Sequence, residues 1–559
     1  MSPDSDRQCS LRVWLALALF LVYAAPLFFP PPATPLTMPP WSAGLMERLF
    51  PGLPPWWVGG RLICLLAAAI IAISVPRRSL GWFESFAAGA TASGSAWTLP
   101  QRSPLTVAAA VIVALQLVAS LLAKHLPRPA QVLFILSLAA PAMLLFLAAW
   151  REAPHSATQN QPVERRIGWA IAAMIVLTVT WRLATAWSSP LVASITDATL
   201  FLTTIEAMLD EHANLLITRM HGTVPYLFLL LIGVGPLEIF GWAPTIHWVQ
   251  ATQCAWIAAV AAGIAWVTLQ SGARHAAAVA TAAYLFSPWT LTMPLFAALQ
   301  VPVAFVPLAL LALLQAIHVR RSVAALALFG PAAAVGLMQP GLVPFTLLAI
   351  ALATYSVATA ASRPRLVIGI AALSFVATLL PALPGAQMLD SLRTYTGGKM
   401  VWTILETLMF GQLNPVFGGL AKEIGSAASS DVIASVLIAP FAITRTPLRL
   451  LGDTLLAPLT VALFTLGIGL CLRFALHSRF ATATLIAVIA VVMPAFVSSY
   501  DRPSFTRAIG MSVMFALIAA IGFEYFRRMF PFARGATVTA ITVLAIAAGG
   551  IALADLVNP

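Results

Sequence analysis

The chain has 559 residues, of which 60% are hydrophobic and only 9% are charged, and its mean hydropathy is +0.92. A soluble globular protein carries about 25% charged residues, so the composition excludes an ordinary water-soluble fold. The formal net charge is +12, but the basic residues form no long patch of the kind that binds nucleic acid. Basic residues also gather in the cytoplasmic loops of membrane proteins. We therefore expect a lipid bilayer, and no nucleic acid, as the partner of this chain.

Long apolar runs follow one another from the first residues to the last. A helix needs roughly 17–25 apolar residues to cross a bilayer, and these runs lack the alternation of outer-membrane barrel strands. The sequence predicts an all-α polytopic membrane protein with about 15 transmembrane helices. The predicted spans are 11–29, 60–76, 105–123, 131–150, 167–187, 243–268, 276–293, 300–318, 323–338, 343–361, 366–384, 454–473, 481–498, 508–526 and 536–555.

A hydrophilic linker, REAPHSATQNQPVERR, divides the chain after residue 150. The loops before it contain few external charges, which sets residues 1–150 apart from the remainder. We predict an accessory N-terminal membrane module of about four helices in 1–150. A core region would then occupy 151–535, and a terminal transmembrane helix would occupy 536–559.

Arginines predict the orientation of the chain. Arg77 and Arg78 follow the second predicted span, and Arg165 and Arg166 precede the fifth. By the positive-inside rule both clusters are cytoplasmic. The N-terminus is then also cytoplasmic, and the loop that begins near Ser188 lies on the external or periplasmic side of the cell (inner) membrane.

The apolar run 224–240 decides the orientation of the later spans. If it crosses the membrane, Arg274 and the pair Arg320 and Arg321 fall outside. If it lies along the outer surface, all three fall inside, as the positive-inside rule requires. Two glycines and a proline interrupt the run, so we choose the second alternative. The same parity makes 385–452 a second external loop, and we expect surface-lying helices in both loops.

The first external loop, at 190–225, concentrates charge in a chain that has little. It contains Asp197, Glu206, Asp210, Glu211, His212, Arg219 and His221. Charge beside a membrane is costly unless it is solvated or used. Asp197 lies about ten residues beyond the fifth span, where a carboxylate could take a proton from an acceptor hydroxyl or amine as a general base. The alternative is that it caps the next helix.

Five further side chains are candidates for substrate binding. Arg393 and Lys399 lie beside two glycines in the second external loop, and Arg502 and Arg507 precede a late span. A guanidinium at the outer surface can bind a phosphate through two hydrogen bonds. His221 precedes a glycine at a turn and could touch substrate. The alternatives are interfacial anchoring and, for Arg502, a pair with its neighbouring aspartate.

No metal ligands are predicted. Asp210 and His212, with a distant acid, are residue types that can hold a divalent cation, but their spacing specifies no site. A divalent cation therefore remains an open alternative, and no other cofactor is indicated. The four cysteines are scattered without a CxxC motif, which indicates inert thiols and neither zinc nor redox chemistry.

The order of these elements is similar to that of a known superfamily. Asp197 opens the loop, Phe201 supplies an aromatic residue, and Met208 and Leu209 end the next helix; the turn at 219–226 reads RMHGTVPY. Together with the late span that opens near Arg507, this order resembles the GT-C superfamily of integral membrane glycosyltransferases. That group includes protein O-mannosyltransferases and the aminoarabinose transferases of lipid A. The resemblance covers roughly residues 165–530.

The resemblance implies that 151–535 is a GT-C-like transferase core. Such an enzyme would move a sugar from a polyprenyl-phosphate donor to an unidentified glycan, lipid or protein acceptor on the external face. Asp197 would be the catalytic base, and Arg507, Arg393 and Lys399 would meet the lipid phosphate. The chain departs from the family pattern at Ala198, where an acid often stands, and it lacks the Lys/His-Pro-Pro-Leu turn.

Two other functions remain alternatives. A transporter or lipid flippase would place ionisable residues near the middle of the bilayer, and most predicted spans contain almost none. A non-catalytic membrane scaffold with the same fold would need neither Asp197 nor Arg507.

Overall fold

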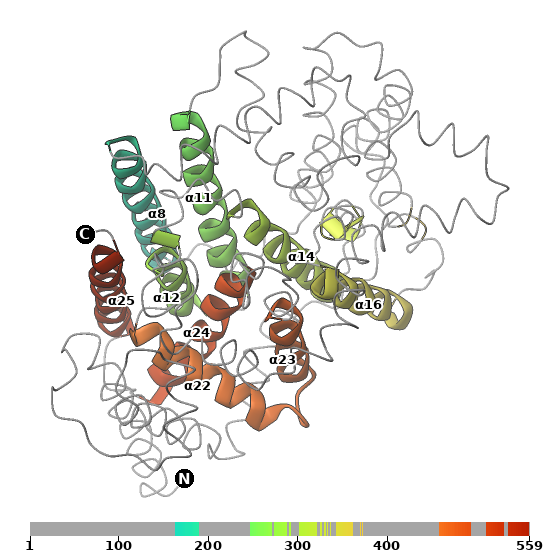
Figure 1. Cartoon of the computed structure of the whole chain (residues 1–559). Helices are drawn as coiled ribbons and strands as arrows, with labels where there is room; N and C mark the ends of the chain where they lie inside the picture. The colour runs from blue at the N-terminus through green and yellow to red at the C-terminus, as the bar shows by residue number, and fades with distance from the viewer. Residues whose placement is uncertain are drawn as a thin grey trace, which may run out of the picture.

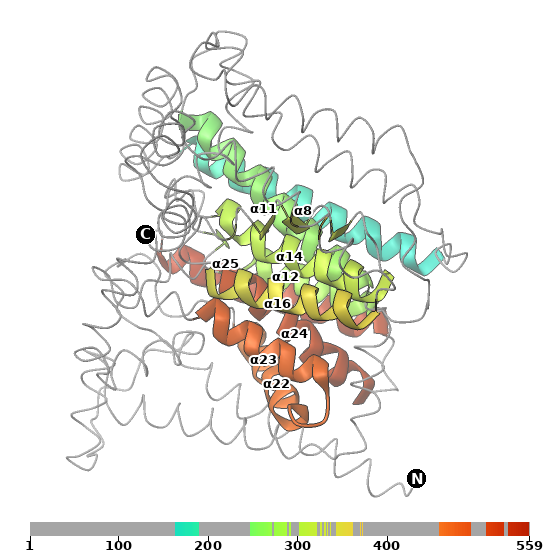
Figure 2. The same ribbon diagram turned by 90° about the vertical axis from the view of Figure 1, so that its right-hand side faces the viewer.

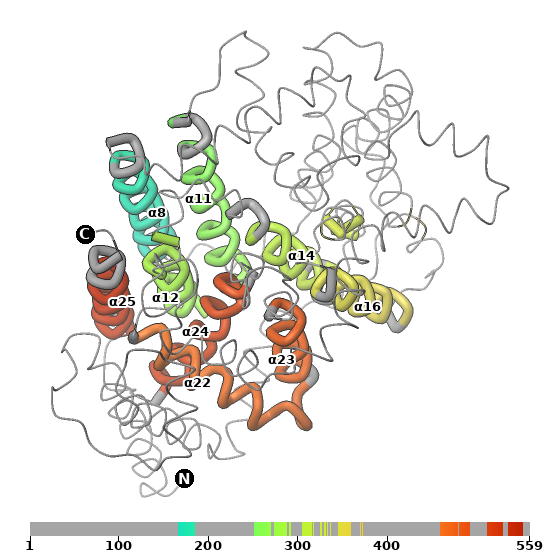
Figure 3. Tube along the Cα trace, viewed as in Figure 1, coloured from blue at the N-terminus to red at the C-terminus, as the bar shows by residue number. Residues whose placement is uncertain are grey.

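The computed structural model describes residues 162–188, 246–270, 273–287, 290–291, 301–320, 343–360, 458–492, 510–529 and 535–557, with a few single residues between 325 and 372. Figure 3 shows the greater part of these segments in colour along the Cα trace.

Within these residues the structure has nine α-helices and no strand (Figure 1). They are α8 (Pro162–Ser188), α11 (Ile246–Gln270), α12 (Arg274–Leu285), α14 (Val301–Arg320), α16 (Val343–Ala360), α22 (Pro458–Phe474), α23 (Arg479–Val492), α24 (Gly510–Met529) and α25 (Gly535–Val557). The predicted all-α class is confirmed for this part of the chain.

Nine of the predicted spans coincide with these helices, from 167–187 in α8 to 536–555 in α25. The helix α12 ends at Leu285, earlier than the predicted span 276–293. The other predicted spans lie outside the continuous described segments. They are 11–29, 60–76, 105–123, 131–150, 323–338 and 366–384. The total of about 15 helices and the module at 1–150 therefore stay predictions.

Two of the described helices are long and apolar enough to cross a membrane, over Arg166–Ala184 in α8 and Ala251–Leu269 in α11. The first presents large apolar side chains outwards, because Trp169 is 71% and Leu177 70% exposed. A helix that is apolar on every side is suited to lipid rather than to water. These helices support the prediction of a membrane-associated protein.

The contacts between helices show how they are oriented. Ile171 of α8 clusters with Ala265 near the end of α11, and Arg182 of α8 borders Cys254 near the start of α11. These two helices are therefore antiparallel, and Figure 2 shows them side by side. By contrast, α11 and α14 run in parallel. The ring centroids of Trp256 and Phe305 lie 5.2 Å apart, and further along both helices Gly263 packs against Leu308.

The helices α12 and α25 also run in parallel. His275 at the start of α12 contacts Thr539 in the first turns of α25, and Phe286, just after α12, packs against Gly550 far along α25. Arg527, close to the end of α24, lies beside the same first turn of α25. The start of α12, the start of α25 and the end of α24 thus meet at one end of the bundle.

We call this end the basic end, defined by Arg166, Arg274, Arg527 and Arg528. The start of α8 and the end of α11 belong to it, because Ile171 and Ala265 cluster with the early part of α12. The opposite end is called the far end. The end of α8, the starts of α11 and α14, and the end of α12 lie there.

The core of the bundle is built around α12. Ten of its residues are buried, and most of them are alanine. It packs against α8, α11, α24 and α25. Small side chains let helix backbones approach closely, which favours dispersion contacts where lipid supplies no hydrophobic driving force. The alanine-rich sequence of α12 therefore explains its central position.

Glycines make a second close contact, between α22 and α24. A methyl group on Gly522 would overlap the backbone carbonyl of Leu463, and one on Gly467 would overlap that of Ile518. The rings of Phe464 and Phe515 pack edge to face beside this contact, 4.7 Å between centroids. The two helices can approach this closely only because both glycines lack a side chain.

Gly522→Ala should therefore destabilise the protein. Overpacking costs about 1–3 kcal/mol, and the obstacle here is a backbone carbonyl that cannot rotate away. The measurement is the thermal unfolding midpoint of the purified protein in detergent. The control is Gly168→Ala in α8, where an added methyl group meets nothing within 4 Å and should stabilise the helix by about 0.5–1 kcal/mol. Equal midpoints for the two variants would contradict this packing.

Candidate functional site

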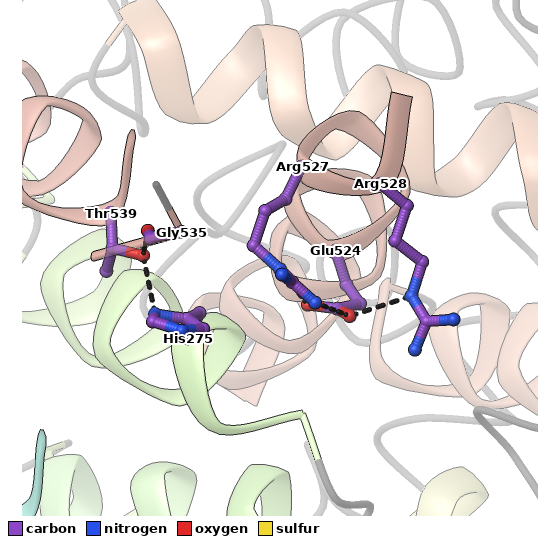
Figure 4. A network of polar contacts seen from close by, with 6 residues as sticks. All are labelled: His275, Glu524, Arg527, Arg528, Gly535 and Thr539. Atoms are coloured by element: carbon purple, nitrogen blue, oxygen red, sulfur yellow. Dashed lines mark hydrogen bonds and ion pairs between the residues drawn. The ribbon is translucent and has the colours of Figure 1, made fainter. Parts of the chain in front are cut away.

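Glu524, Arg527 and Arg528 form an ion-pair network at the basic end of the bundle (Figure 4). Arg527 donates from Nε to Oε2 of Glu524 over 3.0 Å and from Nη2 to Oε1 over 2.6 Å. Arg528 donates from Nε to Oε1 over 2.9 Å. Residues three and four positions apart share a helix face, so the sequence EYFRR in the last turns of α24 brings both guanidinium groups to one carboxylate.

The carboxylate and its partners differ in their exposure. The Glu524 side chain is 3% exposed, whereas those of Arg527 and Arg528 are 28% and 50% exposed. The hydrogen bonds that Arg527 donates to Glu524 raise the pKa of Arg527 above its usual range. The carboxylate is thus held inside by cations that reach the surface, and hydrogen bonds already occupy both of its oxygens. This arrangement suits an anchor of α24 rather than a proton-transferring acid.

His275 connects the starts of α12 and α25. Its Nδ1 lies 2.9 Å from Oγ1 of Thr539, and that hydroxyl donates to the carbonyl oxygen of Gly535 over 2.7 Å. A hydroxyl has one proton, so Nδ1–H of the imidazole is the donor to Thr539. Burial lowers the pKa of His275 below the ordinary value of 6.5, and the charge of Arg527 lowers it further. The imidazole is therefore neutral at pH 7.

A narrow crevice lies at the far end, at the seam of α8, α11 and α12. It is lined by Thr178, Val179, Arg182, Cys254, Ile257, Leu285 and Thr290. Arg182 is only 4% exposed, and its guanidinium carbon lies 4.2 Å from the ring centroid of Trp181. A buried arginine in an apolar bundle is a default candidate for function.

Hydroxyl groups surround the α12 side of this crevice. Ser287 Oγ donates to Thr290 Oγ1 over 2.9 Å and accepts from the Thr290 backbone N–H over 3.1 Å. Tyr284 hydrogen-bonds with Thr290 as well. All three residues are buried. The far end therefore combines one buried cation with a group of buried hydroxyls.

The residues predicted for catalysis and substrate binding lie outside the described residues. These are Asp197, His221, Arg393, Lys399, Arg502 and Arg507. Asp210 and His212, the open alternative for a divalent cation, lie outside them too. Their roles stay predictions, because the structure describes only helices that precede and follow these segments.

Arg182, His275 and Glu524 were not among the predicted site residues. A signal for two of them was present, because Arg182 and Glu524 are charged residues inside predicted spans, at 167–187 and 508–526. Charges at such positions are rare and are usually paired or functional. His275 gave no such signal, since its partner Thr539 is distant in the sequence.

In the part of the chain that the structure describes, no three histidine, cysteine, aspartate or glutamate residues group as metal ligands would. Cys254 and Cys471 are both buried and free, which agrees with the inert thiols expected from their scatter. Cys9 and Cys64 lie outside the described residues.

Comparison with known proteins gives no relative. No family model, no curated protein and no solved structure matches the chain.

Glu524→Gln should destabilise the basic end, because it removes the negative charge that two guanidinium groups share. Hydrogen bonds to charged groups contribute about 1.5–3 kcal/mol each. The control is Arg528→Gln, which removes a half-exposed partner and should cost under about 1 kcal/mol. The measurement is the thermal unfolding midpoint of each variant in detergent. A fall as large for Arg528→Gln as for Glu524→Gln would rule out the buried carboxylate as the centre of this network.

Stability should depend on pH through His275. Because its pKa is lowered in the folded state, its contribution is complete above pH 6.5 and is lost as the pH falls towards the folded-state pKa. The unfolding midpoint of the natural protein should therefore drop between pH 7 and pH 5. His275→Asn keeps an N–H donor but does not titrate, so the unfolding midpoint of this variant should fall less between pH 7 and pH 5. An unchanged pH profile in His275→Asn would contradict the assignment.

Proposed function

We propose that this protein is a membrane glycosyltransferase that moves a sugar from a polyprenyl-phosphate donor to an acceptor on the external face of the cell (inner) membrane. The observation that carries the proposal is the GT-C-like order of elements over residues 165–530, with Asp197 at the start of the first external loop. The helices that flank this loop, α8 and α11, are antiparallel and membrane-length.

The helix directions support the orientation that this function needs. If α8 and α11 both cross the bilayer, the connection from 189 to 245 begins and ends on one side of it. Arg166, Arg274, Arg527 and Arg528 then share the other side, which is cytoplasmic by the positive-inside rule. The far end, and with it the start of the loop that contains Asp197, then faces outwards. The alternative in which 224–240 crosses the membrane alone would require α8 and α11 to be parallel.

The proposed chemistry is a displacement at the anomeric carbon of the donor sugar. The acceptor oxygen or nitrogen forms a bond to that carbon while the bond from the carbon to the phosphate oxygen breaks. Asp197 takes the acceptor proton. The polyprenyl phosphate leaves as an anion, stabilised by Arg507 with Arg393 and Lys399.

His221 and Arg502 complete the proposed substrate-binding set, and no metal ligand belongs to it. A divalent cation bound by the acids of the loop stays an alternative for stabilising the leaving phosphate.

The described charges weigh against a transporter or flippase. Arg182 lies six residues before the end of α8 at Ser188, and Glu524 lies five residues before the end of α24 at Met529. A substrate pathway through the membrane places ionisable groups near its middle, and in the described helices the buried charges lie near helix ends. A non-catalytic scaffold differs from the proposed enzyme in needing neither Asp197 nor Arg507.

Asp197→Asn should abolish transfer, because an amide cannot accept the proton of the acceptor. General-base catalysis contributes about 10²–10⁴-fold in rate, and a loss of that size is expected. The measurement is mass spectrometry of cell-envelope glycans, lipids and glycoproteins from cells with the natural chain, the variant or no chain. The variant should match the absence of the chain.

Asp210→Asn is the matched control, since it removes a carboxylate from the same loop and should keep the product. Full activity of Asp197→Asn in membranes would refute the mechanism. If the products do not change when the chain is removed, the transferase function itself is wrong, and wild-type partner assembly by a variant without Asp197 and Arg507 would favour the scaffold.

A further inference from the structure

The far-end crevice places a positive charge where the proposed function needs one. Arg182 is buried inside the bundle, and a buried charge is stable only with ions, dipoles or hydrogen-bond partners around it. Its guanidinium lies against the ring of Trp181 and borders the crevice lined by Thr178, Cys254 and Thr290.

The surroundings of Arg182 fit an oxyanion. Its guanidinium has five N–H donors in a planar arrangement that matches phosphate. Across the crevice Thr290 belongs to the hydroxyl group with Tyr284 and Ser287, and hydroxyls can donate to phosphate oxygens. On its other side the guanidinium faces Trp181, which is 40% exposed and so connects the crevice to the outer surface of α8.

The outer surface of α8 also suits an apolar tail. Trp169, Val176 and Leu177 are between 62% and 71% exposed, along the same helix that carries Arg182. An amphiphile with its chain along this face and its head group at the far end would bring an anion to the guanidinium. Asp197, nine residues beyond the end of α8 at Ser188, would then be close in sequence to the bound head group.

We propose that Arg182 binds the phosphate of a lipid phosphate, in a site that opens between α8, α11 and α12 at the far end of the bundle. The crevice is closed to water in this structure, so binding requires these helices to separate at that end. The helix α8 is the one expected to move, because it is the less buried of the two membrane-length helices. The identification of this lipid as the sugar donor rests on the proposed function; the phosphate site itself does not.

The test measures the binding of three probes to the purified full-length protein in nanodiscs. Binding is detected by the change in tryptophan fluorescence. The probes are farnesyl phosphate, farnesol and inorganic phosphate. The natural protein should bind farnesyl phosphate at least about tenfold more tightly than farnesol, a difference of about 1.4 kcal/mol. Inorganic phosphate should bind far more weakly than farnesyl phosphate, because it lacks the tail. Equal affinity for farnesyl phosphate and farnesol, or for farnesyl phosphate and inorganic phosphate, overturns the proposal.

Variants connect this preference to the crevice. Arg182→Gln should remove the preference for farnesyl phosphate over farnesol, and Arg182→Lys should keep part of it. Arg166→Gln is the control, because it removes the same charge from an exposed position at the other end of α8. A preference that survives in Arg182→Gln, or that is lost equally in Arg166→Gln, contradicts the proposal.

A measurement on the natural chain covers the case in which Arg182→Gln does not fold. A photoreactive farnesyl phosphate should label peptides from the second half of α8 or the first half of α11, and excess farnesyl phosphate should prevent this labelling. Labelling confined to other segments refutes the site.

The site and the transferase function can fail separately. Asp197→Asn should abolish transfer and leave the preference for farnesyl phosphate unchanged. If no sugar transfer is found while the preference depends on Arg182, the transferase function fails and the phosphate site stands. If transfer depends on Asp197 while Arg182→Gln keeps the donor KM, the phosphate site fails and the transferase function stands.

Discussion

The constraint on which this structure depends is the cost of placing charge inside an apolar helix bundle. Only 9% of the residues are charged, and in the described helices the buried charges lie near the helix ends. Glu524 is kept inside by two arginines that reach the surface, and the imidazole of His275 stays neutral because burial and the charge of Arg527 disfavour its protonation. The rest of the described core is mostly apolar, and several buried hydroxyl groups donate to a carbonyl oxygen one turn earlier in their own helix. Thr281, for example, donates to the carbonyl oxygen of Ala277. This distribution gives the bundle two chemically different ends, and the proposed function depends on that difference.

Much of the helical architecture could be predicted from the sequence. Runs of apolar residues long enough for a bilayer predicted nine spans that coincide with described helices, because an apolar run of that length has no way to satisfy its backbone in a bilayer except as a helix. The ends were less predictable. The span expected to continue to residue 293 ends as a helix at Leu285, and a turn held by Ser287 and Thr290 comes next. A hydrophobicity pattern does not show where a side-chain hydroxyl will accept a hydrogen bond from a backbone N–H. The end of the helix at this turn was therefore not predicted.

The candidate sites were predicted much less well, for a physical reason. Pairings such as His275 with Thr539 join residues 264 positions apart, and a pattern along the chain does not reveal them. Arg182 and Glu524 could have been selected as charges inside predicted spans, but the concentration of acids in the first external loop drew attention to Asp197 instead. The surroundings of the buried charges Arg182 and Glu524 are seen directly in the structure. The charged loop is tied to function only through its resemblance to a superfamily.

Function here depends on which end of the bundle faces outwards. The measurement that tests this most directly is labelling of single cysteines in a chain whose four native cysteines are replaced by serine. Ser194→Cys lies beyond the end of α8 and Ser271→Cys lies just after α11 at the basic end. A membrane-impermeant maleimide added to intact spheroplasts should label Ser194→Cys, and it should label Ser271→Cys only after the membrane is permeabilised. Labelling of both cysteines from the same side would contradict the proposed orientation, and with it the assignment of Asp197 to the external face.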